Sequence, residues 1–196
     1  EGIGKVDGFT LFIKDAVIGD TVEAKIIKSK KHYAYARLEK VIIPSPFRVE
    51  PKCAYHKQCG GCQIQALDYG KQLEFKQEKV RNNLIRLGGF SEEEIDSKLL
   101  APVGMEDPYH YRNKVQAAFG SRGGQLISGV YQSSTHKIVP IDSCLIENSK
   151  ADEIIVTIRK LLKSFKLKPF DENAMTGFLR HVLIRKGYYT GQIMVV

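Results

Sequence analysis

Cysteine spacing is the feature of this chain that most restricts how it can fold. Three cysteines stand in the segment KCAYHKQCGGCQ and a fourth lies far downstream; they are Cys53, Cys59, Cys62 and Cys144. A reducing compartment keeps thiols unpaired, so four cysteines there indicate metal ligation more than disulfides. Four thiolates suit either tetrahedral zinc or a 4Fe-4S cluster. Structural zinc usually takes two cysteine pairs, so a triplet plus one distant cysteine favours the cluster, while zinc and unliganded core cysteines stay open.

Two glycines, Gly60 and Gly61, separate the last two cysteines of the triplet. Because glycine has no Cβ, backbone amides at these positions can approach the sulfur atoms and donate hydrogen bonds to them. His56 lies in the same segment, and we expect it near the sulfurs or exposed rather than as a ligand.

The composition is that of an ordinary globular chain. Its 196 residues are 43% hydrophobic and 27% charged, which allows one domain or two small ones. No run of about 18 apolar residues could span a bilayer, and no apolar segment with a cleavage site opens the chain. We therefore expect a cytoplasmic protein without membrane contact. The chain begins with Glu1 rather than Met and stops on the strand-like GQIMVV, so we also expect a fragment of a longer protein.

The net charge favours a polyanionic partner. It is +8 at pH 7, from 30 Lys and Arg against 22 Asp and Glu, and the sequence pI is about 9.2. Basic side chains that neutralise phosphates release counterions and so bind RNA without regard to sequence. The alternative is a basic surface that meets only solvent.

The first part of the chain has the pattern of a small β-barrel. Apolar and polar residues alternate over 4–14 and 20–43, which predicts strands. Gly8 and the Gly19-Asp20 pair mark turns between them. We predict an OB-like β-barrel domain over 1–43, ended by the proline-rich segment PSPFRVEP.

The rest of the chain, 44–196, is predicted to form an α+β domain that is incomplete at its C-terminus. An apolar stripe predicts a helix that ends at Gly88-Gly89. Ser91 followed by Glu94 is a capping box that starts a second, short helix. The predicted helices cover 68–89, 91–100 and 151–167, and the predicted strands cover 111–120, 125–132, 136–141, 178–187 and 191–196. The fold class is therefore α+β.

These segments together resemble the bacterial 23S ribosomal RNA uracil-5-methyltransferases. Residues 4–53 resemble a TRAM domain, the small RNA-binding β-barrel, joined to the motif C-x5-C-G-G-C. Further matches follow in the family's order: CGGCQIQ, YGKQLEFKQEKVRNNLIRLGG, YRNKVQAAFG, GVYQSSTHKIVPIDSCLI and GQIMVV. The resemblance covers essentially the whole chain.

The resemblance implies an enzyme that methylates C5 of uridine in 23S ribosomal RNA with S-adenosylmethionine. It assigns Cys53, Cys59, Cys62 and Cys144 as ligands of a 4Fe-4S cluster, which we expect to be structural rather than redox-active. The family's catalytic domain, with the cofactor site and nucleophile, lies downstream of the matched region. We therefore name no catalytic or S-adenosylmethionine-binding residue in this chain, and we expect the fragment alone to be inactive.

The expected partner is ribosomal RNA, with no obligate protein partner. Lysines flank the aromatic pair Tyr33 and Tyr35, and a barrel that offers aromatic faces beside basic groups suits single-stranded RNA. The residues expected to contact RNA are Lys25, Lys28, Lys30, Lys31, Tyr33, Arg37, Arg112, Asn113 and Lys114. Packing of the tyrosines inside the barrel, and a salt bridge of Arg112 within the sheet, are the alternatives.

Two other functions stay open at this point. The chain could be a stand-alone RNA-binding module stapled by zinc or by a cluster, or part of a transfer RNA uracil-5-methyltransferase. A radical methylthiotransferase also uses TRAM, but its cluster motif is C-x3-C-x2-C and its TRAM domain comes last.

Overall fold

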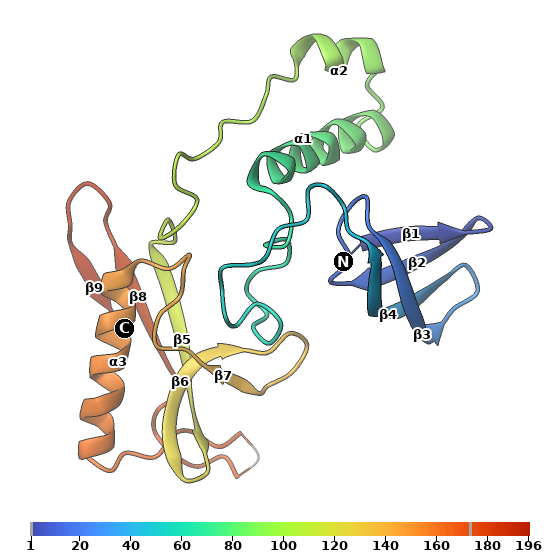
Figure 1. Cartoon of the computed structure of the whole chain (residues 1–196). Helices are drawn as coiled ribbons and strands as arrows, with labels where there is room; N and C mark the ends of the chain where they lie inside the picture. The colour runs from blue at the N-terminus through green and yellow to red at the C-terminus, as the bar shows by residue number, and fades with distance from the viewer. Residues whose placement is uncertain (1, 173) are drawn as a thin grey trace. The chain divides into compact units, whose positions relative to one another are not determined.

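The computed structural model describes residues 2–172 and 174–196 and shows a mixed α+β chain with two β-sheets (Figure 1). The chain divides into two compact units. The first unit runs up to Lys52 and takes in Gln63–Met105; the second consists of Cys53–Cys62 and Glu106–Val196. The predicted α+β class is confirmed, and each unit is described by itself below.

The first unit contains a four-stranded sheet and two helices. Its elements are β1 (Gly2–Val6), β2 (Phe9–Lys14), β3 (Thr21–Ser29), β4 (Tyr33–Ile43), α1 (Tyr69–Arg86) and α2 (Glu92–Lys98). The strand order is β1-β2-β4-β3. β2 runs parallel to β4, while the β1–β2 and β3–β4 pairs are antiparallel. The predicted strands and the turn at Gly8, which has a φ of 80°, are confirmed.

The sheet of the first unit does not close into the predicted OB-like β-barrel within the described residues. Among them β1 and β3 form the two edges of the sheet, and no ladder joins these edges. An OB-type barrel uses five strands and is only partly closed even then. In the described residues β2 and β4 are the inner strands of the sheet, so β1 and β3 stand on opposite edges and are not paired with each other.

Helices α1 and α2 begin and end where the sequence signals lie. The Asp68 side chain caps α1 by accepting a hydrogen bond from the amide of Lys71, and Gly89 takes a φ of 73° just after the helix. Ser91 caps α2, which buries Ile95. Arg81 of α1 reaches across to Glu92 and Asp96, so charged groups join the two helices.

The second unit is an antiparallel sheet covered on one face by a helix. Its elements are β5 (Lys114–Arg122), β6 (Gln125–Tyr131), β7 (Ile138–Pro140), α3 (Ser149–Ser164), β8 (His181–Lys186) and β9 (Ile193–Val195). The strand order is β7-β6-β5-β8-β9, and α3 lies along the sheet, as Figure 1 shows in orange. The core consists of Val115, Ala117, Phe119, Ala151, Ile155, Leu179, Val182 and Ile184.

The two compact units do not have the bounds of the predicted domains 1–43 and 44–196. The four-stranded sheet ends at Ile43, but the unit that contains it also holds α1 and α2. The predicted bounds are those of domains that fold independently. Compactness alone does not test independent folding, so these bounds stay a prediction. Across residues 2–172 and 174–196, no helix combines the length and the apolar character needed to cross a membrane.

Candidate RNA-binding face and cysteine site

Three aromatic rings meet on one side of the first sheet. Phe12 of β2 lies opposite Tyr35 of β4 in the parallel register. The ring centroids of Phe12, Tyr33 and Tyr35 are 5.6 to 5.7 Å apart in all three pairs. Since neighbouring residues of a strand point to opposite sides, and Ala34 and Ala36 are buried, the rings lie on the other side of the sheet. The tyrosines are therefore not in the sheet's buried face, which was the alternative.

Basic side chains surround these rings. Lys25 lies opposite Arg37 and Lys28 lies opposite Tyr35 in the β3–β4 register, so both belong to the same side as the rings. Lys14 of β2 also lies opposite Arg37, and all of these bases are exposed. We call this surface, made by Phe12, Lys14, Lys25, Lys28, Tyr33, Tyr35 and Arg37, the aromatic–basic face. It offers ring surface and positive charge side by side, as single-stranded RNA requires.

The predicted RNA contacts Lys30, Lys31 and Arg37 differ in their position on this face and in how free their charge is. Lys30 and Lys31 lie in the turn between β3 and β4, where the Lys30 amide donates to the Tyr33 carbonyl over 2.8 Å. Arg37 is paired with Glu39 over 2.7 Å, so part of its charge is neutralised. Sequence reasoning missed Phe12 and Lys14, because the parallel pairing of β2 with β4 leaves no local pattern.

The predicted contacts Arg112, Asn113 and Lys114 lie in the second unit, where β5 begins. Arg112 is half-buried, and its backbone pairs with that of Glu147. Burial raises the pKa of the Glu147 carboxyl, and the charge of Arg112 offsets part of that rise. Asn113 accepts a hydrogen bond from the Lys186 amide over 2.9 Å. Lys114 is exposed and lies opposite Arg185 of β8. Of the three, Lys114 is the one whose surroundings best suit a phosphate.

All four cysteines belong to the second unit. The loop Cys53–Cys62 packs on the end of β6, where the Gly60 amide donates to the Tyr131 carbonyl over 3.3 Å. A Cβ on Gly60 would stand 3.0 Å from the Ser133 nitrogen, so the loop comes this close because glycine is there. The Gly61 amide donates to the Cys59 sulfur over 3.3 Å, as the glycine pair predicted. On the other side, the Cys144 amide donates to Asp152 over 2.8 Å.

Burial and negative charge raise the pKa of two of the thiols, those of Cys59 and Cys144. Burial is the main cause of the raised pKa of Cys59, and Cys62, Cys53 and Glu147 add to it. Burial likewise raises the pKa of Cys144 to about 11, with a contribution from Glu147. The pKa of Glu147 itself rises to about 7, first through burial and then through Asp152. A cation would reverse these shifts, because a bound metal stabilises thiolate.

The donor chemistry thus fits a thiolate-ligated metal centre, but the side chains are not gathered into one. All four thiols are half-buried and free of disulfides. Yet within residues 2–172 and 174–196 no group of three or more His, Cys, Asp or Glu side chains converges closely enough to hold a metal ion. The structure brings the loop and Cys144 into one unit but, among the described residues, does not gather three or more of the sulfurs into a metal-binding group.

Comparison with known proteins adds evidence independent of these distances. The TRAM domain family matches residues 1–38. A protein of Clostridium acetobutylicum named "uncharacterized RNA methyltransferase" is 46% identical over the whole chain. Proteins of the same name from Clostridium tetani and Listeria innocua are 44% and 40% identical over the chain. The chain spans only 42% of the length of each of these relatives.

A solved structure is similar as well. It is the crystal structure of Pyrococcus abyssi tRNA (uracil-54, C5)-methyltransferase in complex with S-adenosyl-L-homocysteine, with a TM-score of 0.67 and 25% identity. The match covers 99% of this chain and 42% of that one. The predicted TRAM domain is therefore present, and the resemblance to RNA uracil-5-methyltransferases is confirmed.

Proposed function

We propose that this chain is the RNA-binding part of an S-adenosylmethionine-dependent methyltransferase that methylates C5 of uridine in 23S ribosomal RNA. The observation that carries the proposal is the similarity of the whole chain to proteins named RNA methyltransferases. The Pyrococcus abyssi structure supports it, since that protein is a uracil C5 methyltransferase in complex with S-adenosyl-L-homocysteine. S-adenosylmethionine would be bound by a part of the protein outside these residues. We place the protein in the cytoplasm, where ribosomal RNA is found.

In this proposal the aromatic–basic face holds single-stranded RNA. Bases stack on Tyr33 and Tyr35, and phosphates lie against Lys25 and Lys28. The remaining predicted contacts, Lys30, Lys31 and Arg37 beside this face and Arg112, Asn113 and Lys114 in the second unit, complete the proposed set.

The test is the affinity of the chain for a labelled oligouridine of about 20 nucleotides, which exceeds the site size of a small β-module. Changing Lys25→Ala with Lys28→Ala should lower the salt slope by about 1.4, at about 0.7 per phosphate contact. The matched control is Lys76→Ala with Lys79→Ala on α1, which removes equal charge from exposed residues outside the face. Equal losses in both double variants would show that the face has no special role.

We further propose that Cys53, Cys59, Cys62 and Cys144 hold a 4Fe-4S cluster. Support comes from the triplet-plus-one spacing, the shared unit and the Gly61 amide aimed at the Cys59 sulfur. Once bound, the cluster would tie the Cys53–Cys62 loop to the Cys144 segment. The four thiolates would supply its ligands, and the loop amides would stabilise their charge.

Iron, zinc and acid-labile sulfide in protein purified without oxygen test this assignment. About four irons and four sulfides per chain are expected for a 4Fe-4S cluster; about one zinc without sulfide would replace the cluster with a structural zinc site. Cys144→Ser should remove most of the iron, while the neighbouring change Ser143→Ala should leave it in place. Full iron content in Cys144→Ser would mean that the fourth ligand is another residue.

Transfer RNA is the second candidate substrate, because the similar Pyrococcus abyssi enzyme is a methyltransferase of uracil 54 in tRNA. Competition binding separates the two. Unlabelled 23S ribosomal RNA fragments should displace the oligouridine at lower concentration than unmodified tRNA does. The reverse order would favour a transfer RNA methyltransferase.

A further inference from the structure

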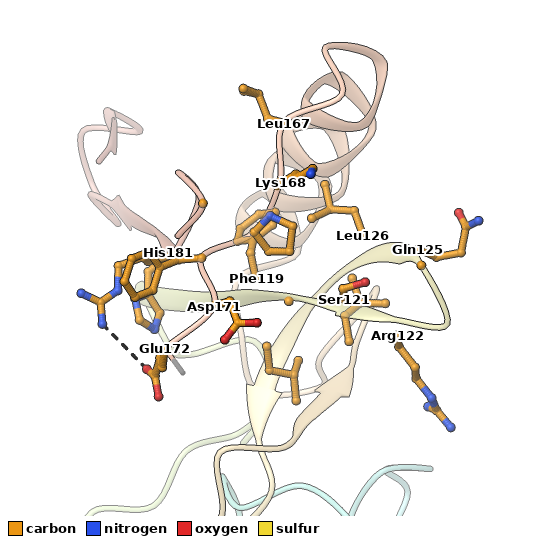
Figure 2. Close-up of a pocket in the computed structure, with 18 of the residues that line it drawn as sticks. Phe119, Ser121, Arg122, Gln125, Leu126, Leu167, Lys168, Asp171, Glu172 and His181 are labelled. Carbon is orange, nitrogen blue, oxygen red and sulfur yellow. Dashed lines mark ion pairs between the residues drawn. The ribbon is translucent and has the colours of Figure 1, made fainter. Parts of the chain in front are cut away.

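A large hollow lies along β6 of the second sheet; Tyr131, at the end of β6 where the Cys53–Cys62 loop packs, is one of its lining residues, and none of the predicted RNA contacts lines it. β5 and β6 extend past the first residue of β8, since Ala118 is the last residue of β5 that pairs with β8. The projecting hairpin forms one wall, and the segment that includes Lys168, Asp171 and Glu172 forms the other (Figure 2). The hollow measures about 1250 Å³.

Basic side chains dominate its lining. They are Arg122, Lys137, Lys163, Lys166, Lys168 and Arg180, against the two acids Asp171 and Glu172. Glu172 is already engaged by His136 at 2.9 Å and by Arg180 at 3.7 Å, and the latter pair is dashed in Figure 2. The negative charge in the hollow is therefore partly neutralised by side chains that also line it.

Most of the positive charge has no partner. Lys163 donates to Gln125 over 2.8 Å, and the Arg180 guanidinium lies 4.5 Å from the Phe170 ring centroid. The other four bases make no side-chain hydrogen bond or ion pair with any residue in 2–172 or 174–196; they are Arg122, Lys137, Lys166 and Lys168. A concave surface focuses the field of such charges and attracts anions into it.

Aromatic surface stands beside this charge. Tyr131 at the end of β6 is 37% exposed. Its ring centroid lies 5.9 Å from that of His136 and 6.3 Å from that of His181. This ring cluster favours a nucleic acid over an acidic protein surface as the occupant, because a nucleobase can stack on the rings. Unpaired bases around an exposed ring therefore favour single-stranded RNA as the occupant.

We propose that this hollow is a second RNA-binding site, distinct from the aromatic–basic face, that takes single-stranded RNA. Phosphates lie against Arg122, Lys166 and Lys168, and one base lies on Tyr131. The proposal rests on the proposed function, because it assumes that RNA is the ligand of this protein. It adds a site in the second unit that neither the sequence motifs nor the comparisons assign.

Lysine replacement tests the phosphate contacts. Lys166→Gln with Lys168→Gln should weaken binding of the labelled oligouridine about 25-fold at about 0.1 M salt and lower the salt slope by about 1.4. Lys150→Gln with Lys160→Gln removes the same charge from exposed positions of α3 that do not line the hollow. This control should stay within about twofold of the unaltered chain, since it removes no phosphate contact.

Tyr131 tests the stacked base. Tyr131→Ala should weaken binding roughly tenfold without changing the salt slope, because a stacked ring releases no counterion. Tyr131→Phe keeps the ring and should bind as the unaltered chain does. Thermal unfolding shows whether Tyr131→Ala is folded. If it is not, the lysine variants still test the proposal, because they change only exposed side chains.

The outcomes separate this proposal from the proposed function. If the Lys25 and Lys28 variant loses affinity and the Lys166 and Lys168 variant binds as its control does, the hollow is not an RNA site although the face is. If the unaltered chain does not bind the oligouridine, both proposals fall. If polyglutamate binding, and not oligouridine binding, depends on Lys166 and Lys168, the hollow is a protein-docking site and this proposal is wrong.

Discussion

At the scale of the residue, Asp20 shows how one side chain fastens the first unit. Its carboxylate is 1% exposed and accepts hydrogen bonds from the amides of Val17 at 2.7 Å and Ser45 at 3.0 Å. Arg48 adds three more contacts between 2.5 and 3.1 Å. The turn before β3 is thus tied to the segment after β4. From the sequence, Asp20 was only a turn residue, because nothing local points to a partner at Arg48.

The pKa of Asp20 makes this tie dependent on pH. Burial alone raises that pKa, but the bonds from Arg48, Ser45 and Val17 outweigh burial and lower it to about 2. A carboxylate with a lowered pKa stabilises the fold above its unfolded pKa of about 4, and this contribution is lost as the pH falls toward 2. The difference between the two pKa values corresponds to about 2 kcal/mol at pH 7.

Asp20→Asn should therefore lower the free energy of unfolding by at least about 2 kcal/mol at pH 7, since Arg48 also loses its partner. Urea denaturation followed between about pH 7 and pH 3 should show a weaker pH dependence in this variant, because the shifted carboxylate is gone. The same change at exposed Asp7, in the turn after β1, serves as the control. Equal pH dependence in both variants would mean that Asp20 does not carry the effect.

At the scale of the element, local sequence patterns predicted the helices and strands reliably but did not predict how the strands pair. Alternation and helical periodicity located the strands and all three helices, because these patterns depend on neighbours in the chain. The order β1-β2-β4-β3, with a parallel pair in its middle, has no local signal, and so the open sheet was predicted as a barrel. The capping box was half right: Ser91 accepts from the Glu94 amide, but the Glu94 side chain pairs with Lys98 instead.

Ser91→Ala tests the half of the capping box that the structure contains, the hydrogen bond from the Glu94 amide to the Ser91 side chain. A helix as short as α2, with seven residues, has little stability of its own, and loss of an N-cap costs about 1 kcal/mol. The amide of Leu99, which bonds to the Ile95 carbonyl in α2, should exchange its hydrogen about fivefold faster, since that is the ratio for 1 kcal/mol. Ser97→Ala, inside the helix, should not speed exchange; if both variants behave alike, the cap is not what holds α2.

At the scale of the whole molecule, we propose that the chain binds RNA and expect that it does not transfer a methyl group by itself. In our proposal all four cysteines hold the cluster, and a metal-bound thiolate is not available as a nucleophile. With radiolabelled S-adenosylmethionine and 23S ribosomal RNA, the 196-residue chain should transfer no label, while it still binds the oligouridine. Transfer by the chain alone would show that a nucleophile and a cofactor site lie among these residues.

The division of the chain into units also decides how it can be cut. The peptide passes from one unit to the other at three places, around residues 52, 62 and 105, so no single break separates the two. A truncation that starts at Glu106 keeps Cys144 and discards the three other cysteines. One that stops at Met105 keeps those three on a loop that has lost the strand it packs on. Neither half would hold all four cysteines, so under the proposed assignment neither could bind the cluster, and their free thiols would be open to oxidation in air.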